Sequence, residues 1–263
     1  MKIYHYTSIE TLALILKNKT IRFNRLDQVD DVEEVSECSL RIKLGLYTFV
    51  SCWTKSHEEN VALWKMYTPN MRGVRIELDS NMFLKQEINT EIKKDSLISA
   101  TSSIIPDEKI QYKGYVVNIW GDPTNWLYPI EYVRNPVEMA KEAIVITPEN
   151  SSLFHFNKIG TYKHTRWNFQ EESRYKLFVL PDFLPNESLD EYWQRFRNII
   201  TNNTPPPFTD YYVDITPKYF SEMEITLGPL SNISDQIIVE SLVKEHCPSA
   251  IIKTSNLTGK IRK

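Results

Sequence analysis

The chain is organised around one stretch of sequence, Trp167-Asn168-Phe169-Gln170-Glu171-Glu172-Ser173-Arg174-Tyr175. We expect residues 170–180 to form a strand, in which every second side chain points to the same face. Gln170, Glu172 and Arg174 then project together as a carboxamide, a carboxylate and a guanidinium. Spacing alone favours a solvated sheet face on which the glutamate and the arginine pair. The motifs elsewhere in the chain favour a functional site.

Composition sets the class of protein. The chain has 263 residues, of which 41% are hydrophobic and 25% are charged, enough for a full hydrophobic core. Lys and Arg together number 31 against 34 for Asp and Glu, so the net charge of -3 gives no general basic surface for long nucleic acid. No stretch approaches the roughly twenty apolar residues of a membrane span, and the N-terminus has no signal-peptide pattern. We therefore expect a cytoplasmic protein.

Several kinds of site find no support in the sequence. With seven glycines, the chain has no Gly-rich phosphate loop. No serine sits in a nucleophile elbow. We expect no metal site, because the five histidines form no ligand pair at helical spacing. The three cysteines, an odd number, fit reduced thiols, and Cys52 fits a small buried hydrophobe. A Cys-His dyad stays open, although nothing favours it. These residues are His5, His57, His155, His164, His246, Cys38, Cys52 and Cys247.

The first residues predict a strand, helix, strand unit. Residues 2–6 form the expected first strand, and Thr7-Ser8-Ile9-Glu10 has the form of a capping box that starts a helix at once. This helix should end near Asn18, and residues 21–23 should form the next strand. His5 then lies at a strand-to-helix corner. A histidine at such a corner, bonded to backbone, is a common structural feature.

An acidic run follows, Asp27-Gln28-Val29-Asp30-Asp31-Val32-Glu33-Glu34. Its carboxylates could coordinate a divalent cation. The run lacks the glycine and the alternating spacing of a calcium loop. Acids at the start of a helix, where they complement the macrodipole, are the favoured interpretation.

The remaining patterns mix strands and helices without regular alternation, which favours an α+β fold with mixed sheets and flanking helices. Ser56-His57-Glu58-Glu59 forms a second capping box before a helix with Asn60, Trp64 and Tyr67 on one side. A third helix, capped at Ser188, carries an apolar stripe that fits the core better than a partner-binding surface. Residues 83–94 fit either a helix or a loop. Strands are expected at 47–54, 74–79, 109–120, 211–215, 223–227 and 250–254, and further helices at 136–142 and 234–246.

Motifs over most of the chain resemble a widespread, uncharacterised bacterial domain family. They are Tyr4-His5-Tyr6-Thr7-Ser8, Phe49-Val50-Ser51-Cys52, Leu63-Trp64-Lys65-Met66-Tyr67 with Gly73-Val74, Trp167 with Gln170-Glu171-Glu172-Ser173-Arg174, and Leu227-Gly228-Pro229 before a final helix. Two regions depart from the family pattern. The acidic motif Asp30-Asp31-Val32-Glu33-Glu34 lacks the expected Asn and Pro, and residues 84–130 have no match. We interpret residues 1–263 as a single domain with an unassigned insertion around residues 84–130.

That family in turn resembles ADP-ribosyltransferases, including bacterial toxins that modify DNA bases, and the resemblance implies a split β core that binds NAD as substrate. It implies that His5 binds a ribose hydroxyl of NAD, and that the backbone at Tyr6 and Thr7 binds the amide of nicotinamide. It places Gln170 and Glu172 in the Gln-x-Glu motif that supplies the catalytic glutamate. Candidates for the aromatic wall beside the ring are Trp64 and Tyr67.

The chemistry fits these residue types. Breaking the bond between nicotinamide and ribose builds positive charge on the sugar, which the Glu172 carboxylate would stabilise mainly in the transition state. Gln170 would orient the acceptor. Arg174 would either meet the pyrophosphate of NAD or hold Glu172 by a charge-assisted hydrogen bond, and the second role is favoured.

Two classes of function remain open. The first is a mono-ADP-ribosyltransferase that modifies a macromolecule, either a protein or a nucleic acid. For a nucleic acid, the near-neutral charge favours single-stranded RNA or DNA reached through aromatic stacking. The resemblance further implies a toxin or phage-defence effector, with an antitoxin protein as a possible partner. The second class is a catalytically silent module of the same fold that binds a nucleotide or a protein.

Overall fold

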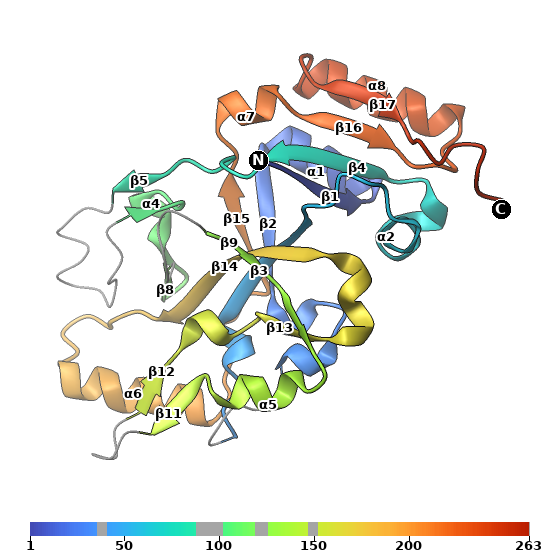
Figure 1. Cartoon of the computed structure of the whole chain (residues 1–263). Coiled ribbons are helices and arrows are strands. Elements are labelled where there is room, and N and C mark those ends of the chain that lie inside the picture. The colour runs from blue at the N-terminus through green and yellow to red at the C-terminus, as the bar shows by residue number, and fades with distance from the viewer. Residues whose placement is uncertain (36–40, 88–101, 119–125, 147–151, 263) are drawn as a thin grey trace.

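One large mixed sheet runs through the molecule, with helices on its flanks (Figure 1). The computed structural model describes residues 1–35, 41–87, 102–118, 126–146 and 152–262. Among these residues, eleven strands form the sheet. Its main path is β17 (Ile251–Thr254), β16 (Glu224–Leu227), β4 (Val74–Asp79), β1 (Lys2–Thr7), β3 (Thr48–Thr54), β14 (Glu172–Pro181), β8 (Tyr115–Asn118) and β7 (Gln111–Tyr112). Off this path, β2 (Thr20–Arg25) joins β3 to β15 (Asp210–Asp214), and β9 (Leu127–Pro129) pairs with β14.

Strand direction agrees with the expected α+β class. Within the large sheet, β16 and β17 pair in parallel, whereas the other described pairs are antiparallel. Three small two-stranded sheets complete the described part. They are β10 (Glu131–Val133) with β13 (Tyr162–His164), β11 (Ile144–Ile146) with β12 (Ser152–Phe154), and β5 (Gln86–Glu87) with β6 (Ser102–Ser103).

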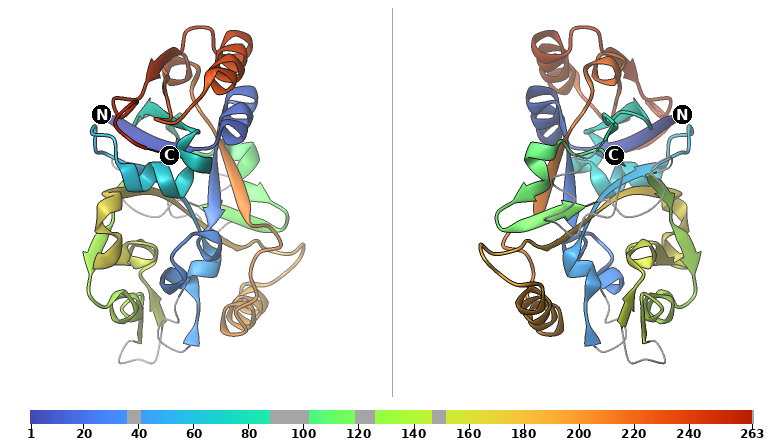
Figure 2. Two further views of the ribbon diagram at one scale, coloured as in Figure 1. Left: turned by 90° about the vertical axis from the view of Figure 1, so that its right-hand side faces the viewer. Right: turned by 90° about the vertical axis from the view of Figure 1, so that its left-hand side faces the viewer.

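Helices lie at the two ends of the sheet and at its sides, where α2 and α4 are placed (Figure 1). Red α8 packs beside blue α1 at the upper end, and α6 lies at the lower end (Figure 2). No helix in the described ranges is long and apolar enough to cross a bilayer. The α-helices are α1 (Ile9–Asn18), α2 (Val61–Tyr67), α4 (Asp107–Ile110), α5 (Pro136–Lys141), α6 (Leu189–Thr201), α7 (Pro217–Ser221) and α8 (Ile233–His246). Short 3₁₀ helices are η1 (Leu26–Gln28), η2 (Val32–Val35), η4 (Leu44–Tyr47), η5 (Pro69–Met71), η6 (Phe156–Lys158) and η7 (Thr165–Gln170).

Helix caps correct two of the three expected capping boxes. Ser8, not Thr7, caps α1 by accepting from the backbone N–H of Thr11 at 3.2 Å, so Thr7 completes β1. Asn60 caps α2, with its carboxamide oxygen 2.8 Å from the backbone nitrogen of Ala62, and the box at residues 56–59 is wrong. Asn60 is closer to the unpaired N–H groups of the first turn. The box at Ser188 is confirmed.

The apolar stripe of α6 is only partly core. Tyr192, Phe196 and Ile200 are buried in a cluster with Leu180 and other residues of the lower half, as expected. Leu189 and Trp193, on the same predicted stripe, are 58% and 38% exposed. In the poorly matched segment, residues 109–120 form α4, β7 and β8 as far as residue 118. Of residues 83–94, expected as a helix or a loop, residues 86–87 form a strand and residues 88–94 lie outside the described residues.

The sheet opens between β1 and β3. β1 pairs with β4 along its whole length, from Lys2 to Thr7. With β3 it shares one residue pair, Tyr4 opposite Thr54. Along the same edge, β3 next pairs with β2, where Asn24 lies opposite Val50 and Arg25 lies opposite Phe49. The two neighbouring strands therefore separate just after Tyr4, and the functional residues lie around this opening.

Candidate active site

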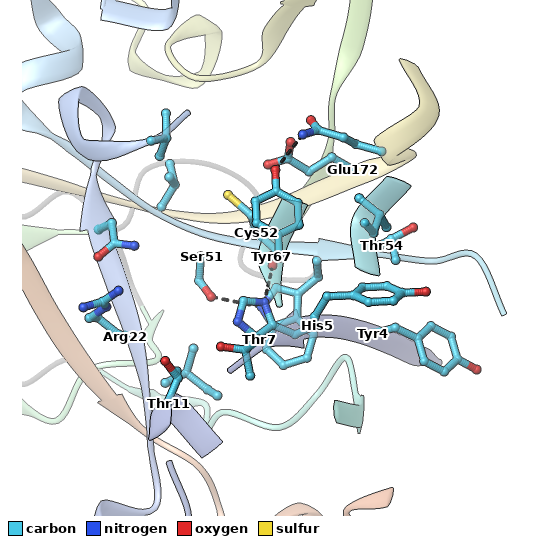
Figure 3. Close-up of a pocket in the computed structure, with 18 of the residues that line it drawn as sticks. Tyr4, His5, Thr7, Thr11, Arg22, Ser51, Cys52, Thr54, Tyr67 and Glu172 are labelled. Atoms are coloured by element: carbon cyan, nitrogen blue, oxygen red, sulfur yellow. Dashed lines mark hydrogen bonds between the residues drawn. The ribbon is translucent and has the colours of Figure 1, made fainter. Parts of the chain in front are cut away.

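A cavity of about 470 Å³ lies where β1 and β3 separate (Figure 3). This volume falls within the roughly 300–1,000 Å³ of small-molecule sites. Its wall includes His5 from β1, Cys52 from β3, Tyr67 from α2, and Gln170 and Glu172 from the stretch singled out in the sequence. The structure therefore brings the His-Tyr motif and the Gln-x-Glu motif, 165 positions apart, to one cavity, as the motif order predicts.

Gln170 reaches this cavity from a turn, which corrects the predicted start of the strand. Gln170 is the last residue of η7, and Glu171 adopts a left-handed conformation with φ 44°. The Glu171 N–H donates to the Asn168 carbonyl at 3.2 Å and closes this turn. β14 begins at Glu172, so Glu172 and Arg174 share a strand face and Gln170 approaches them from outside it.

The shared face is buried, so the solvated-face interpretation is wrong. Arg174 is 0% exposed, Glu172 7% and Gln170 3%. Arg174 donates through Nε to Oε1 of Glu172 and through both terminal nitrogens to Glu34. Arg174 therefore has the favoured positioning role, and its guanidinium is not free to bind pyrophosphate. Burying so many charges requires that they compensate each other.

Lys163 of β13 completes the charge balance. Its Nζ lies 2.7 Å from Oε1 of Gln170 and 3.0 Å from Oε2 of Glu172. It also lies 3.4 Å from Glu34 and 3.6 Å from Asp30. Two cations, Lys163 and Arg174, thus face three carboxylates, Asp30, Glu34 and Glu172. We call these five residues the charge cluster. Its net charge is one negative charge.

The charge cluster keeps Glu172 ionised. Burial alone would raise the pKa of its carboxyl group, but Arg174 and Lys163 outweigh burial and hold the pKa well below its usual value. The same carboxylates raise the pKa of Lys163 despite its burial. Cys52, in contrast, is kept in its neutral form. Burial and the nearby Glu172 carboxylate raise the pKa of its thiol well above 9.0. A protonated thiol is a poor nucleophile, so Cys52 does not fit a Cys-His dyad.

The cysteines within the described residues are free thiols, as expected. Cys52 and Cys247 are free cysteines, and Cys38 lies outside the described residues. Cys247 is buried, whereas Cys52 is half-buried in the cavity wall. The prediction of a buried Cys52 therefore holds only in part, because the residue also lines the cavity.

The acidic run supplies residues of the charge cluster and does not start an α-helix. Residues 26–28 and 32–35 form 3₁₀ turns, so the macrodipole interpretation is wrong. Asp30 accepts from the Tyr67 hydroxyl at 2.5 Å, and that hydroxyl accepts from Nε2 of Gln170 at 2.7 Å. Burial and the Asp30 carboxylate raise the pKa of Tyr67. Among the described residues, no three His, Cys, Asp or Glu side chains are placed to hold a metal ion.

His5 is held as a neutral ring. Its Nδ1 lies 2.9 Å from the backbone carbonyl oxygen of Cys52. A carbonyl can only accept, so Nδ1 carries the proton and Nε2 is left as the acceptor of the ring. Burial lowers the pKa of His5, against the Cys52 carbonyl, which raises it. His5 therefore makes the hydrogen bond to backbone that is common for a histidine at a strand-to-helix corner, and its ring also lines the cavity.

The backbone of Tyr6, not of Thr7, faces the opening. The Ser80 N–H donates to the Met1 carbonyl at 2.7 Å, so this residue pair is hydrogen-bonded. Hydrogen-bonded and open pairs alternate along an antiparallel ladder. In the register of β1 with β4, Thr7 then points its backbone groups at β4, and Tyr6 points its own toward β3. No described strand pairs with Tyr6 on that side. Thr7 contributes its side chain to the cavity.

Trp64 does not form an aromatic wall for the cavity. It is fully buried, and its ring packs edge-to-face against Tyr6 with centroids 4.9 Å apart. Its Nε1 donates to Glu59 at 2.9 Å. Trp64 therefore lies on the inner side of α2, one turn away from Tyr67, which does line the cavity. The aromatic role expected for this helix falls to Tyr67 alone.

Sequence reasoning missed Lys163, Glu34 and Asp30. Lys163 lies in a strand of three residues, too short to show a period. The available signal was the pairing requirement of Glu172 and Arg174, since buried charges need partners and the acidic run offers them.

Comparison of the chain with family models, with curated proteins and with solved structures found no match.

Proposed function

We propose that this protein is an NAD-dependent mono-ADP-ribosyltransferase that transfers ADP-ribose to a macromolecular acceptor. One observation carries the proposal: His5 of β1 and Glu172 of β14 line a single cavity at the point where β1 and β3 separate. The resemblance to ADP-ribosyltransferases implies a split β core, and an opening between two neighbouring strands supports that expectation. Both motif residues occupy positions that the resemblance assigns to ribose binding and catalysis.

The groups around the opening suit the nicotinamide ribose half of NAD. A neutral His5 offers Nε2 as an acceptor for a ribose hydroxyl. The backbone N–H and carbonyl of Tyr6 offer one donor and one acceptor, which match the carboxamide of nicotinamide. Tyr67 supplies an aromatic ring in the cavity wall. Thr7 adds its side chain beside these groups.

Glu172 is placed to stabilise positive charge. In the reaction, the bond between C1′ of the ribose and the nicotinamide nitrogen breaks, and its electron pair leaves with neutral nicotinamide. A lone pair of the acceptor forms the new bond to C1′, and the acceptor releases its proton to solvent. The sugar carries positive charge between these events, and a fixed, ionised carboxylate stabilises that charge without reorganisation. Gln170 is bonded to Lys163 and Tyr67, so its role is to position the charge cluster.

The experiment uses NAD labelled in its adenylate phosphate. The purified protein is incubated with labelled NAD and cell lysate, and the label is then followed through protease and nuclease digestion. We expect macromolecular label with the parental protein and loss of it with Glu172→Gln. Glu224→Gln is the matched control, because Glu224 is also a strand glutamate paired with a lysine, on β16 next to the edge strand β17. Equal labelling by all three proteins would contradict the proposal.

The acceptor class follows from the same digestion. Nuclease-sensitive label on single-stranded RNA or DNA fits the near-neutral charge of the chain, and protease-sensitive label identifies a protein acceptor. A toxin or phage-defence role would further require that expression of the parental protein arrests cell growth and that expression of Glu172→Gln does not. An antitoxin partner would relieve this arrest.

One observation favours a silent binding module of the same fold. Both oxygens of the Glu172 carboxylate are already engaged, Oε1 by Arg174 and Oε2 by Lys163. Such a carboxylate offers less of its charge to a substrate than a free one would. Release of nicotinamide separates the two functions, because a binding module takes up NAD and returns it unchanged.

A further inference from the structure

The cavity has opposite charges at its two sides. Glu172 and Tyr67 lie on one side of His5, and Arg22 and Thr11 lie on the other (Figure 3). Asp30 joins the Glu172 side through its bond to Tyr67. The Glu172 side therefore carries the net negative charge of the charge cluster, and the opposite side carries the positive charge of Arg22.

The local structure of β2 presents Arg22 to the cavity. Its burial alternates, with Ile21, Phe23 and Arg25 buried and with Arg22 and Asn24 on the other face. Arg25 is committed to Asp27, with Nε 2.7 Å from Oδ1. Arg22 forms no salt bridge with any residue in the described ranges, and across the ladder it faces Tyr212. Arg22 is exposed, and its guanidinium interacts with the hydroxyl of Tyr212, a neutral partner that leaves its positive charge available to a ligand.

Neutral hydrogen-bonding groups line the cavity together with Arg22. Asn24 and Thr11 line the same cavity. Ser51 also lines it, and its Oγ accepts from Nε1 of Trp53 at 3.0 Å. Because that oxygen already accepts, the hydroxyl hydrogen of Ser51 remains for a ligand acceptor. A guanidinium beside hydroxyl and carboxamide donors is an arrangement that binds phosphate oxygens.

We propose that Arg22, with Asn24 and Ser51, binds the pyrophosphate of NAD. The dinucleotide then crosses His5, with its pyrophosphate toward Arg22 and its nicotinamide ribose toward Glu172. This inference rests on the proposed function for the identity of the ligand. Charge supports the direction, because oxidised NAD has an anionic pyrophosphate and a cationic ring, and the cavity has a cationic and an anionic side. Arg174, which the sequence also offered for this role, is fully buried and bonded to Glu34.

The test is a calorimetric titration of Arg22→Gln with NAD, ADP-ribose, ADP and nicotinamide. Loss of one charge-assisted contact should weaken binding of the three phosphate ligands by about tenfold to a hundredfold and leave nicotinamide unchanged. Higher salt should weaken binding to the parental protein more than binding to the variant. Arg197→Gln is the control, since Arg197 is an exposed arginine of α6 that contacts only a backbone carbonyl of its own helix in the described structure.

The outcomes separate this inference from the proposed function. A folded Arg22→Gln protein that binds NAD and ADP-ribose as tightly as the parental protein overturns the inference. Failure of the parental protein to bind any of the three phosphate ligands also overturns it. If the parental protein binds ADP and ADP-ribose through Arg22 but never releases nicotinamide from NAD, the inference stands and the transferase proposal falls.

Discussion

Arg174 and Glu34, 140 positions apart, form a buried ion pair in which Nη2 lies 2.8 Å from Oε1. Their side chains are 0% and 1% exposed. The pair ties η2 to β14 and fixes the guanidinium whose Nε holds Glu172. Glu34 therefore acts on the candidate catalytic residue through Arg174. This contact gives the acidic run a structural role that its local sequence does not reveal.

Replacing Glu34 with Gln should destabilise the fold strongly. The substitution removes the carboxylate that accepts from both terminal nitrogens of Arg174 inside the fold, and a hydrogen bond to a charged group typically contributes about 1.5–3 kcal/mol, although Glu172 still compensates the guanidinium. Glu33→Gln is the control, because the neighbouring Glu33 pairs with Arg166 at the surface, 3.3 Å away. An exposed pair contributes about 0–1 kcal/mol. Urea unfolding of both variants measures the difference, and equal free energies of unfolding would contradict the buried pair.

Glu172 should make the free energy of unfolding depend on pH in the acid range. Its folded pKa is lowered from 4.5, so the unfolded state binds its proton at a higher pH than the folded state does. The stabilisation is complete above about pH 4.5 and is lost as the pH falls toward the folded pKa. Thermal melts between pH 6 and pH 3 should show a smaller loss of Tm for Glu172→Gln than for the parental protein. A loss of the same size would mean that the Glu172 carboxyl is not stabilised in its charged form.

Local patterns predicted the elements well and the site only in part. Strict alternation located β4, and the Ser188 box located α6. The order of the motifs was enough to place His5 and Glu172 at one cavity. The position of Gln170 was not predictable, because a left-handed residue at 171 ends η7 just before β14 and no local signal marks it. Gln170 fits the alternation of the strand in the sequence, but in the structure it lies in the turn before the strand begins.

Long-range partners were beyond the reach of local patterns. The acidic run fitted a helix start equally well, because a carboxylate has the same local signature in both roles. What distinguishes the two roles is Arg174, which lies far along the chain. Trp64 and Tyr67 share one side of a helix in projection, but only the structure shows that Trp64 turns inward against Tyr6.

Trp64 and Trp193 give a test of that assignment. Trp64→Phe removes a buried hydrogen bond to Glu59 and leaves a small void, so we expect a loss of about 1–3 kcal/mol in the free energy of unfolding. Its affinity for NAD should stay at the parental value, because Trp64 does not line the cavity. Trp193→Phe, on α6 and 38% exposed, should change stability by about 0.5 kcal/mol or less. If a folded Trp64→Phe protein bound NAD more weakly than the parental protein, Trp64 would after all be part of the aromatic wall that contacts NAD.

His5→Ala should weaken both NAD binding and turnover. A ribose contact acts in the ground state as well as in the transition state, so its loss raises the dissociation constant. His5→Asn is a useful companion variant, since its carboxamide can still offer an acceptor to the ribose and a donor to the Cys52 carbonyl. Partial rescue of NAD affinity by Asn is expected in a direct titration. If alanine and asparagine bind NAD as the parental protein does, His5 is a corner histidine with a structural role only.

Glu172→Gln separates catalysis from binding. The substitution keeps the size of the side chain but removes its negative charge, and Arg174 retains Glu34 while Lys163 retains Gln170 and two carboxylates. If the carboxylate stabilises charge that exists mainly in the transition state, NAD affinity should change little. Transfer should fall by about a hundredfold to a thousandfold, which is typical for the loss of one such electrostatic contact.

The measurement pairs an NAD titration with a label-transfer assay on the same Glu172→Gln preparation, after a thermal melt has shown that the variant is folded. Gln170→Ala serves as a second variant. Gln170 positions Lys163 and Tyr67 and does not carry the charge, so its loss should slow transfer less than the loss of the carboxylate does. A folded Glu172→Gln protein that binds NAD and transfers at the parental rate would make the charge cluster a structural device, and the binding module would then be the better account of this cavity.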